Sequence, residues 1–295
     1  MSPAVRRKKR DEIKMTISPF RGLTDYKSCV DIQREVWRFE DIDIYPTGML
    51  IATDQCGGLA LGAYNSIGEM IGFAYSVLSM EDGKLAQHSL LLAVRQAYRN
   101  FNVAFRLKLA QRKECLKRKI PTITWAFDPM QPLNAYFTLG KLGATAHAYA
   151  EDFYGESSSV LHRGLPTDRL MARWDLESDR VEQCIEMGSP RHDLRKELKR
   201  YKVINRLEDA APGMPVSTPL RLTGTDDRLL FEIPYNLPEI KNRNLGTALE
   251  WQGKLRQAFR HYLGKDYAAT DFWVAEEDGH LRAFYFLEKK SKHPR

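Results

Sequence analysis

The pattern of apolar and polar positions changes twice along the chain. Between residues 59 and 94, short apolar runs are separated by turn residues such as those at 65–69. This pattern predicts strands at 59–64, 70–78 and 85–94, with the first two forming a hairpin. Residues 26–37 have helical spacing instead, and Thr24 is the expected N-cap of that helix.

Beyond Val94 the apolar period lengthens to that of a helix at 103–119, which Pro121 closes. A β-branched and aromatic strand is expected at 122–127, then a short helix at 133–142 and strands at 146–153 and 170–176. The acidic segment 39–48 is expected to be a loop. The strands on either side of the long helix should be parallel neighbours, joined by a right-handed crossover.

The second change follows Trp174. A basic segment at 191–206 precedes a linker-like stretch at 210–219, which is rich in Pro, Gly and Ala. A strand at 229–233, a helix at 245–262 and a hairpin at 270–287 are then expected. We therefore expect a domain over 16–177 and a smaller C-terminal α/β extension over 178–295. The extension's aromatic residues need a partner surface, so it should pack on the preceding domain.

These elements predict an α/β (α+β) fold, in which a mixed, mostly antiparallel sheet is flanked by helices. Composition agrees, because 43% of the 295 residues are hydrophobic and 28% are charged. No apolar run approaches the roughly 18 residues of a membrane span, and no apolar region typical of a secretory signal follows the basic N-terminus. We therefore expect a cytoplasmic protein that does not enter the membrane.

Cysteine and charge patterns narrow the function classes. The four cysteines lack metal-ligand or disulfide spacing, so no metal is expected. Much of the net charge of +7 lies in Arg6–Arg10, within a basic tail expected to be disordered over residues 1–15. Such a run can bind nucleic acid or a membrane surface, but no aromatic residue interleaves it, which favours a solvated tail. The remaining positive charge suits an anionic cofactor.

The most informative segment is the junction between the strand ending at Val94 and the following helix, which reads V-R-Q-A-Y-R-N-F-N-V-A-F. A helix N-terminus offers backbone N–H groups without helical partners and the positive end of the helix dipole. Together these groups form a site suited to a pyrophosphate. Arg99 adds a charge-assisted donor.

This junction resembles the pyrophosphate loop of the GNAT acetyltransferase superfamily, Gln/Arg-x-x-Gly-x-Gly/Ala. Arg99 and Ala104 match the first and last positions, and Asn102 replaces the first glycine. Asparagine is the non-glycine residue that best tolerates a left-handed backbone. The stretch Asn134–Ala144 resembles the family's N-A…K-L-G-F segment. The resemblance covers about 17–176, and longer stretches resemble a bacterial subgroup of the family up to the C-terminus.

The resemblance implies an acyl-CoA-dependent N-acyltransferase whose cosubstrate is acetyl-CoA or another acyl-CoA. The acceptor would be a small-molecule amine or an amino acid, and a homodimer is left open. The implied cofactor-binding residues are Leu92, Val94, Arg99, Asn100, Phe101, Asn102, Val103, Ala104, Asn134 and Phe137.

Acyl transfer needs a base for the acceptor amine and a proton for the leaving thiolate. The family's proton-donating tyrosine corresponds to Leu139 here, and Tyr136 lies one turn away. The glutamate base of some members corresponds to His88, eleven residues before Arg99. Asp128 ends the next strand and could hold the substrate ammonium.

Alternatives remain open for these residues and for the whole chain. His88 could be a hydrogen-bonded strand histidine, and Asp128 could be a turn carboxylate before Pro129. The replacements at Asn102 and Leu139 also suit a non-catalytic acyl-CoA-binding regulatory protein on the same scaffold. A third hypothesis is a nucleic-acid-associated factor that uses the basic tail and the segment 191–206.

Overall fold

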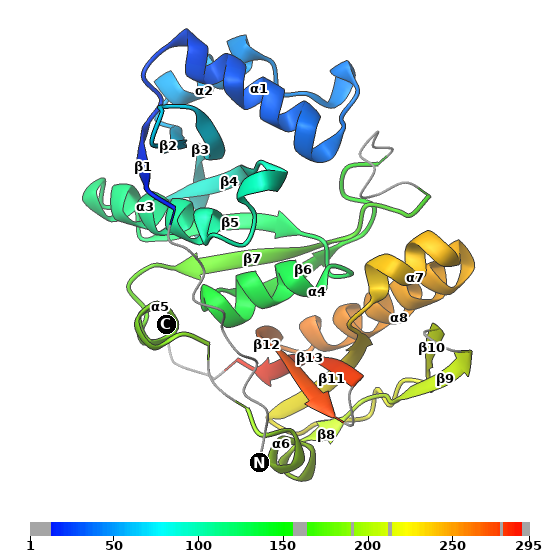
Figure 1. Ribbon diagram of the computed structural model, residues 1–295. Helices are drawn as coiled ribbons and strands as arrows, with labels where there is room; N and C mark the ends of the chain where they lie inside the picture. The colour runs from blue at the N-terminus through cyan, green and yellow to red at the C-terminus, as the bar shows by residue number, and fades with distance from the viewer. Residues whose placement is uncertain (1–12, 156–163, 190–191, 212–213, 278–279, 291–295) are drawn as a thin grey trace. The chain divides into compact units, whose positions relative to one another are not determined.

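The computed structural model describes residues 13–155, 164–189, 192–211, 214–277 and 280–290 (Figure 1). These residues form two compact units, and the division falls between Ile123 and Thr124. The expected boundary at 177/178 therefore lies inside the second unit. Residues 1–12 of the expected basic tail lie outside the described residues, while Met15 already begins a strand.

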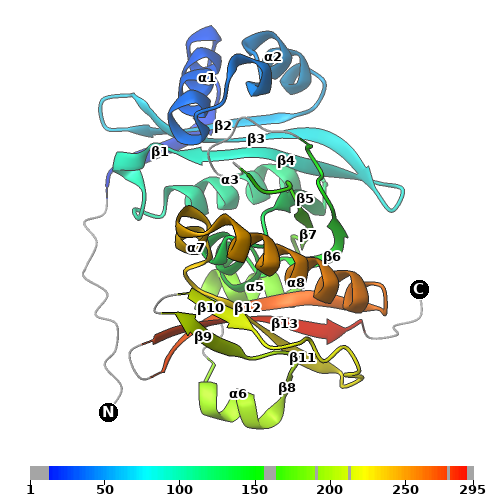
Figure 2. The ribbon, with the colours of Figure 1, turned by 90° about the vertical axis from the view of Figure 1, so that its right-hand side faces the viewer.

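The first unit is an antiparallel sheet with the strand order β1-β2-β3-β4. Helices α1 and α2 cover one face of these strands, and α3 covers the other (Figure 2). Its elements are β1 (Met15–Pro19), α1 (Leu23–Trp37), the 3₁₀ turn η1 (Asp41–Asp43), α2 (Thr47–Gln55), β2 (Leu59–Asn65), β3 (Met70–Glu81), β4 (Lys84–Val94), the 3₁₀ turn η2 (Gln96–Tyr98) and α3 (Val103–Lys117).

The apolar core of this unit lies between the sheet and α1–α2. Phe73 and Tyr75 of β3 pack there with Leu91 of β4 against Cys29 and Ile32 of α1. The predicted strands are confirmed, but two details differ. The N-cap of α1 is Gly22, so Thr24 lies inside the first turn and does not cap the helix. Part of the expected loop at 39–48 starts α2.

The second unit has the strand order β5-β7-β6-β12-β13-β11-β8, with a separate two-stranded ribbon of β9 and β10. Its strands are β5 (Thr122–Phe127), β6 (Thr145–Ala150), β7 (Arg169–Asp175), β8 (Lys202–Val203), β9 (Leu207–Ala211), β10 (Met214–Ser217), β11 (Arg228–Pro234), β12 (Tyr267–Glu277) and β13 (His280–Lys289). Its helices are α4 (Pro132–Ala135), the π-helix η3 (Tyr136–Lys141), α5 (Asp179–Met187), α6 (Leu194–Arg200), α7 (Leu237–Arg243) and α8 (Leu245–Leu263).

The expected α/β class with a mostly antiparallel sheet is confirmed, since β8 and β11 pair in parallel whereas β6–β7, β6–β12, β12–β13 and β11–β13 are antiparallel. The stretch at 210–219 is not a linker, because the β9–β10 ribbon occupies most of it and Trp251 donates to the Pro215 carbonyl at 2.8 Å. The expected parallel pairing of the strands on either side of α3 stays a prediction. Among the described helices, none combines the length and apolar character that crossing a bilayer requires.

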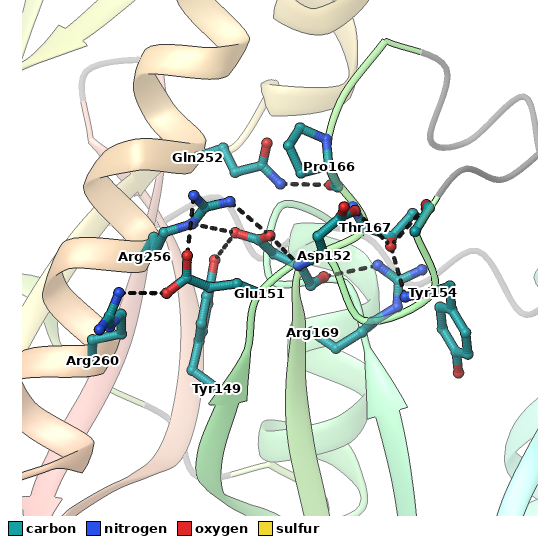
Figure 3. Close-up of polar contacts among 12 residues, drawn as sticks. Tyr149, Glu151, Asp152, Tyr154, Pro166, Thr167, Arg169, Gln252, Arg256 and Arg260 are labelled. Atoms are coloured by element: carbon teal, nitrogen blue, oxygen red, sulfur yellow. Dashed lines mark hydrogen bonds and ion pairs between the residues drawn. The ribbon is translucent and has the colours of Figure 1, made fainter.

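Helix α8 ties the C-terminal region to β6 and to the segment that leads into β7. Phe259 of α8 stacks on Tyr149 of β6, with ring centroids 5.7 Å apart. Arg256 donates to both oxygens of the buried Asp168, at 2.9 and 3.0 Å, and Tyr149 donates to the same carboxylate at 2.7 Å (Figure 3). Burial alone would raise the pKa of Asp168, but these hydrogen bonds lower it below its ordinary value. Asp168 is therefore an ionised carboxylate, and both of its oxygens bind Arg256, which connects the start of β7 to α8.

Candidate functional site

The loop between β4 and α3 has two residues in the left-handed backbone region. Asn100 has φ of 71°, and Asn102, the N-cap of α3, has φ of 60° and ψ of 18°. Most L-residues avoid this region, whereas glycine and asparagine adopt it readily. The position where the family pattern has glycine thus requires the conformation that glycine provides, and asparagine meets that requirement.

The N-terminus of α3 is suited to an anion. No acidic residue lies in its first turn, and the Asn102 side chain makes no capping bond to the helix. The first helical hydrogen bond runs from the N–H of Arg106 to the carbonyl of Asn102 at 3.0 Å. The amide groups of Val103 and Ala104 precede it and therefore have no helical acceptor. Two amides and the positive end of the helix dipole thus point out of the helix start.

The remaining sequence-predicted residues of the first unit surround this loop. Arg99 is exposed, and its Nε donates to the carbonyl of Val94 at 3.4 Å. Phe101 is half-buried, as are Leu92 and Val94 at the end of β4. The structure therefore gathers the predicted pyrophosphate residues at one end of β4, with a cationic side chain beside them.

Strand β4 contains a β-bulge near its middle. Tyr75 of β3 is opposite Leu91, whereas the next residue, Ser76, is opposite Ser89, so Leu90 is the extra residue. A bulge interrupts the ladder and redirects a backbone N–H group, and bulges are over-represented next to active sites. Sequence reasoning missed this residue because it lies in a run of leucines that reads as an ordinary buried strand.

His88 lies two residues before the bulge and is opposite Val77 of β3. Its ring is half-buried, and burial lowers its pKa, with a further decrease from the charge of Lys108. A lowered pKa leaves the imidazole neutral near pH 7, which is the form that accepts a proton. A neutral imidazole fits a base, and it fits equally the strand histidine that the sequence left open.

Asp128 follows β5 in the second unit. One of its oxygens accepts the Met130 N–H at 2.8 Å, which is the geometry of the turn carboxylate that the sequence left open. Burial raises the pKa of Asp128, and nearby Arg169 opposes this rise, as does Lys241 of α7. The carboxyl group thus combines a turn role with a position among cationic side chains.

The segment after β5 runs through α4 into the π-helix η3, a rare form that is frequent at functional sites. Tyr136 is 37% exposed, whereas Leu139 is fully buried. Asn134 is exposed and accepts from the Thr138 hydroxyl at 3.5 Å, and Phe137 is half-buried. Tyr136 is thus an accessible hydroxyl in this segment, and the position of the family's tyrosine is inside the core.

Each unit therefore holds a part of the predicted set. His88 and the residues from Leu92 to Ala104 belong to the first unit, and Asp128, Asn134, Tyr136 and Phe137 belong to the second. Over the described ranges, no group of three or more His, Cys, Asp or Glu side chains is arranged to hold a metal ion.

Comparison with protein-family models finds no match, and comparison with curated proteins finds none either. Similar solved structures do exist. The ribosomal-protein-S18-alanine N-acetyltransferase from Escherichia coli is 14% identical, with a TM-score of 0.45 over 56% of this chain and 96% of that chain. The PaiA N-acetyltransferase from Thermoplasma acidophilum, in complex with coenzyme A, is 15% identical, with a TM-score of 0.42 over 55% and 99%.

An acetyltransferase of the GNAT family from Staphylococcus aureus Mu50 is 14% identical, with a TM-score of 0.39 over 56% of this chain and all of that chain. The similarity to each of the three therefore extends over slightly more than half of the present chain. At these identities and TM-scores, the similarities establish neither the family nor the activity of this protein.

Proposed function

We propose that this protein is an acyl-CoA-dependent N-acyltransferase that transfers an acetyl or related acyl group to the amine of a small molecule or amino acid. The observation behind this proposal is the pair of left-handed asparagines, Asn100 and Asn102, directly before a helix N-terminus without acidic or capping side chains. Such a start of a helix after a central strand is suited to a pyrophosphate group. We further propose that the protein works in the cytoplasm.

In this proposal the pyrophosphate of CoA accepts hydrogen bonds from the amides of residues 100–104. Arg99 adds a charged donor at the exposed edge of the same loop. The half-buried Leu92 and Val94 line the path of the pantetheine along β4. Asn134 and Phe137 are proposed to contact the thiol end of the cofactor.

The bulge at Leu90 would act on the acyl group. A backbone N–H that the bulge directs away from β3 can donate to the thioester carbonyl. The carbonyl oxygen becomes negatively charged when the amine attacks, so a fixed donor there stabilises the transition state more than the ground state.

The acceptor amine must lose a proton before or during attack on the thioester. In the proposed mechanism His88 takes that proton, directly or through water, and Asp128 holds the ammonium beforehand. The new C–N bond forms as the C–S bond breaks, and the thiolate leaves as CoA. Its proton comes from solvent or from the accessible hydroxyl of Tyr136, because Leu139 has no proton to give.

The C-terminal region of residues 178–295 is proposed to cover the acceptor. Two of its residues lie beside the turn that follows β5. The Tyr285 hydroxyl donates to the Pro129 carbonyl at 2.8 Å, and Lys241 opposes the rise in the pKa of Asp128. The extension would therefore help to determine which amines reach the carboxylate.

One observation favours a second candidate function, a non-catalytic acyl-CoA-binding regulatory protein. The buried Leu139 removes the proton donor that the family resemblance leads us to expect. The two functions share the cofactor site and differ in turnover.

Release of CoA thiol from a panel of acyl-CoAs, in the presence of small amines and amino acids, separates these two functions. Mass spectrometry of the acceptors identifies any acyl product. The proposal predicts acceptor-dependent thiol release and a product with the mass of one added acyl group. Tight acyl-CoA binding without turnover on any acceptor would support the regulatory function instead.

A further inference from the structure

A layer of buried polar side chains lies between β3–β4 and α3, on the face opposite the apolar core of the first unit. Such a layer is unusual, because polar side chains are costly to bury unless hydrogen-bonded. Its members are Ser76, Gln87, Ser89, Lys108 and Gln111, all buried.

Hydrogen bonds join these side chains into two separate series. The Lys108 ammonium donates to Gln111 Oε1 at 2.7 Å, and Gln111 Nε2 donates to the Ser89 hydroxyl at 3.4 Å. On the other side, the Ser76 hydroxyl donates to Gln87 Oε1 at 2.7 Å, and Gln87 Nε2 donates to the Gly57 carbonyl at 2.8 Å. The two strand residues that flank His88, Gln87 and Ser89, are therefore both held on the α3 face.

Lys108 is the unusual member because only 2% of its surface is exposed. Burial lowers the pKa of its amine to about 7. The titratable group on its own helix that opposes this decrease is Cys115, whose thiol is itself kept neutral by burial. Glu114 and Arg118 act on that thiol with opposite signs. A leucine or methionine would fill the same space without the cost of desolvating an amine. The presence of a lysine at this buried position therefore calls for a functional explanation.

The charge of Lys108 acts on His88 of β4, whose side chain lies on the opposite side of the sheet. Adjacent strand residues point to opposite faces, and Ser89 points toward α3, so His88 points to the other face. Its β3 partner Val77 packs against the core under α1 and α2, which agrees with this orientation. The charge of Lys108 nevertheless lowers the pKa of the imidazole, second only to burial.

We propose that Lys108 is a positioning residue for the candidate base. It holds the Ser89 segment of β4 through Gln111, and its charge keeps the His88 imidazole in the proton-accepting form as the pH falls. This inference rests on the proposed function, in which His88 takes the acceptor proton.

The physical mechanism is a coupled titration. As the pH falls through neutrality, the Lys108 amine gains a proton within a buried layer, where a charge is screened less than in water. Protonation of His88 then requires a second positive charge close to the first, which is unfavourable. The imidazole therefore stays neutral to a lower pH than it would beside an uncharged side chain.

The test is an NMR titration of the His88 ring protons in the wild type and in Lys108→Met. Methionine fills a similar volume without a charge, so the His88 midpoint should rise by about 0.5–1 pH unit toward the ordinary value. The midpoint of the acid limb in the profile of kcat against pH should move to higher pH by the same amount, with the Kd for acyl-CoA unchanged. Lys113→Met, at an exposed position of the same helix, should leave the midpoint unchanged.

A second measurement needs no variant. In wild-type protein with ¹³C-labelled lysine, the Lys108 side chain should titrate near pH 7, well below the ordinary lysine value of about 10.4. The proposal is wrong if no lysine titrates near neutrality, or if the His88 midpoint is the same in Lys108→Met. Failure of the proposed function would appear differently, as a shifted His88 midpoint in a protein that transfers no acyl group.

Discussion

At the scale of single residues, Asn102 shows how a departure from a motif can keep the motif's conformation. The sequence predicted that asparagine could adopt the left-handed backbone of the missing glycine, and its φ of 60° confirms this. The same conformation at Asn100 was not predicted, because an asparagine in a loop tolerates many backbone angles. The role of His88 stays a prediction, since its burial and its lowered pKa fit both a base and a structural histidine.

Substitutions at Asn102 should separate conformation from side-chain chemistry. Asn102→Gly should keep CoA affinity within about threefold, because glycine reaches the left-handed region freely. Asn102→Val should lower the free energy of unfolding by about 1–2 kcal/mol and weaken CoA binding, since a β-branched residue is strained there. Urea unfolding and calorimetry measure the two effects. Equal CoA affinity in both variants would show that the backbone conformation is irrelevant to the site.

His88→Ala should lower kcat by about 10²–10⁴-fold, the usual contribution of a general base. The Kd for CoA should stay nearly unchanged, because His88 is not among the residues proposed to hold the pyrophosphate. The wild-type acid limb should lie below the ordinary histidine value of about 6.5, since burial lowers the pKa of this ring. A variant with full turnover and an unchanged acid limb would make the histidine structural.

At the scale of elements, periodicity predicted the long or strongly patterned segments well. The strand at 122–127 has the predicted bounds, and α3 begins at the predicted Val103. Strand β1, with 5 residues, follows the basic stretch, and helix α2, with 9 residues, follows the acidic one. Both were missed because such short elements contain too few repeats of the apolar pattern to be identified. The bulge at Leu90 and the π-helix η3 depend on pairing with other elements, which local sequence does not encode.

Helix α6 is held on the C-terminal sheet by a histidine between two carboxylates. His192 is 3.1 Å from Asp271 of β12 and 3.4 Å from Glu197 of α6, and its ring stacks on Phe286 of β13. Arg180 of α5 lies 3.7 Å from the same Asp271. Burial would lower the pKa of His192, but the two carboxylates outweigh it and raise the pKa above the ordinary value.

The raised pKa gives the stability of this region a defined pH dependence. Protonated His192 is stabilised in the folded state, so its contribution is complete below about pH 6.5 and is lost as the pH rises through the folded-state pKa. We therefore expect the free energy of unfolding to fall across this range as the folded-state imidazole loses its proton. His192→Gln should remove that slope in urea unfolding, whereas His261→Gln, on α8, should retain it. An identical slope in all three proteins would contradict this account.

At the scale of the whole molecule, the domain boundary that the sequence predicts near residue 177 stays a prediction, and the described residues group into two compact units that divide after Ile123. Local patterns show where composition changes, but they do not show which segments pack together. Residues 124–177 contact the C-terminal region through several buried groups. Arg256 binds Asp168, Arg180 donates to the Leu139 carbonyl at 3.1 Å, and β12 pairs with β6.

A chain that ends at Ser178 should therefore not fold as an independent acyltransferase domain. It would lose Arg256, the charged donor that binds both oxygens of Asp168 in the full chain. It would also expose Tyr149, which packs under Phe259 of α8. Circular dichroism melting should show no cooperative transition, in contrast to the full chain. A truncated chain that melts cooperatively and transfers acyl groups normally would show that the C-terminal region is dispensable.

The central claim is that the β4–α3 junction binds CoA, and calorimetric titration of CoA tests it most directly. The wild type should bind, and Arg99→Ala should weaken binding by about 1.5–3 kcal/mol, the scale of a charged hydrogen bond, which is a roughly 10- to 150-fold rise in Kd. Lys113 is an exposed cation farther along α3, and Lys113→Ala should bind CoA like the wild type. Absence of CoA binding to the wild type at millimolar concentration would contradict the account.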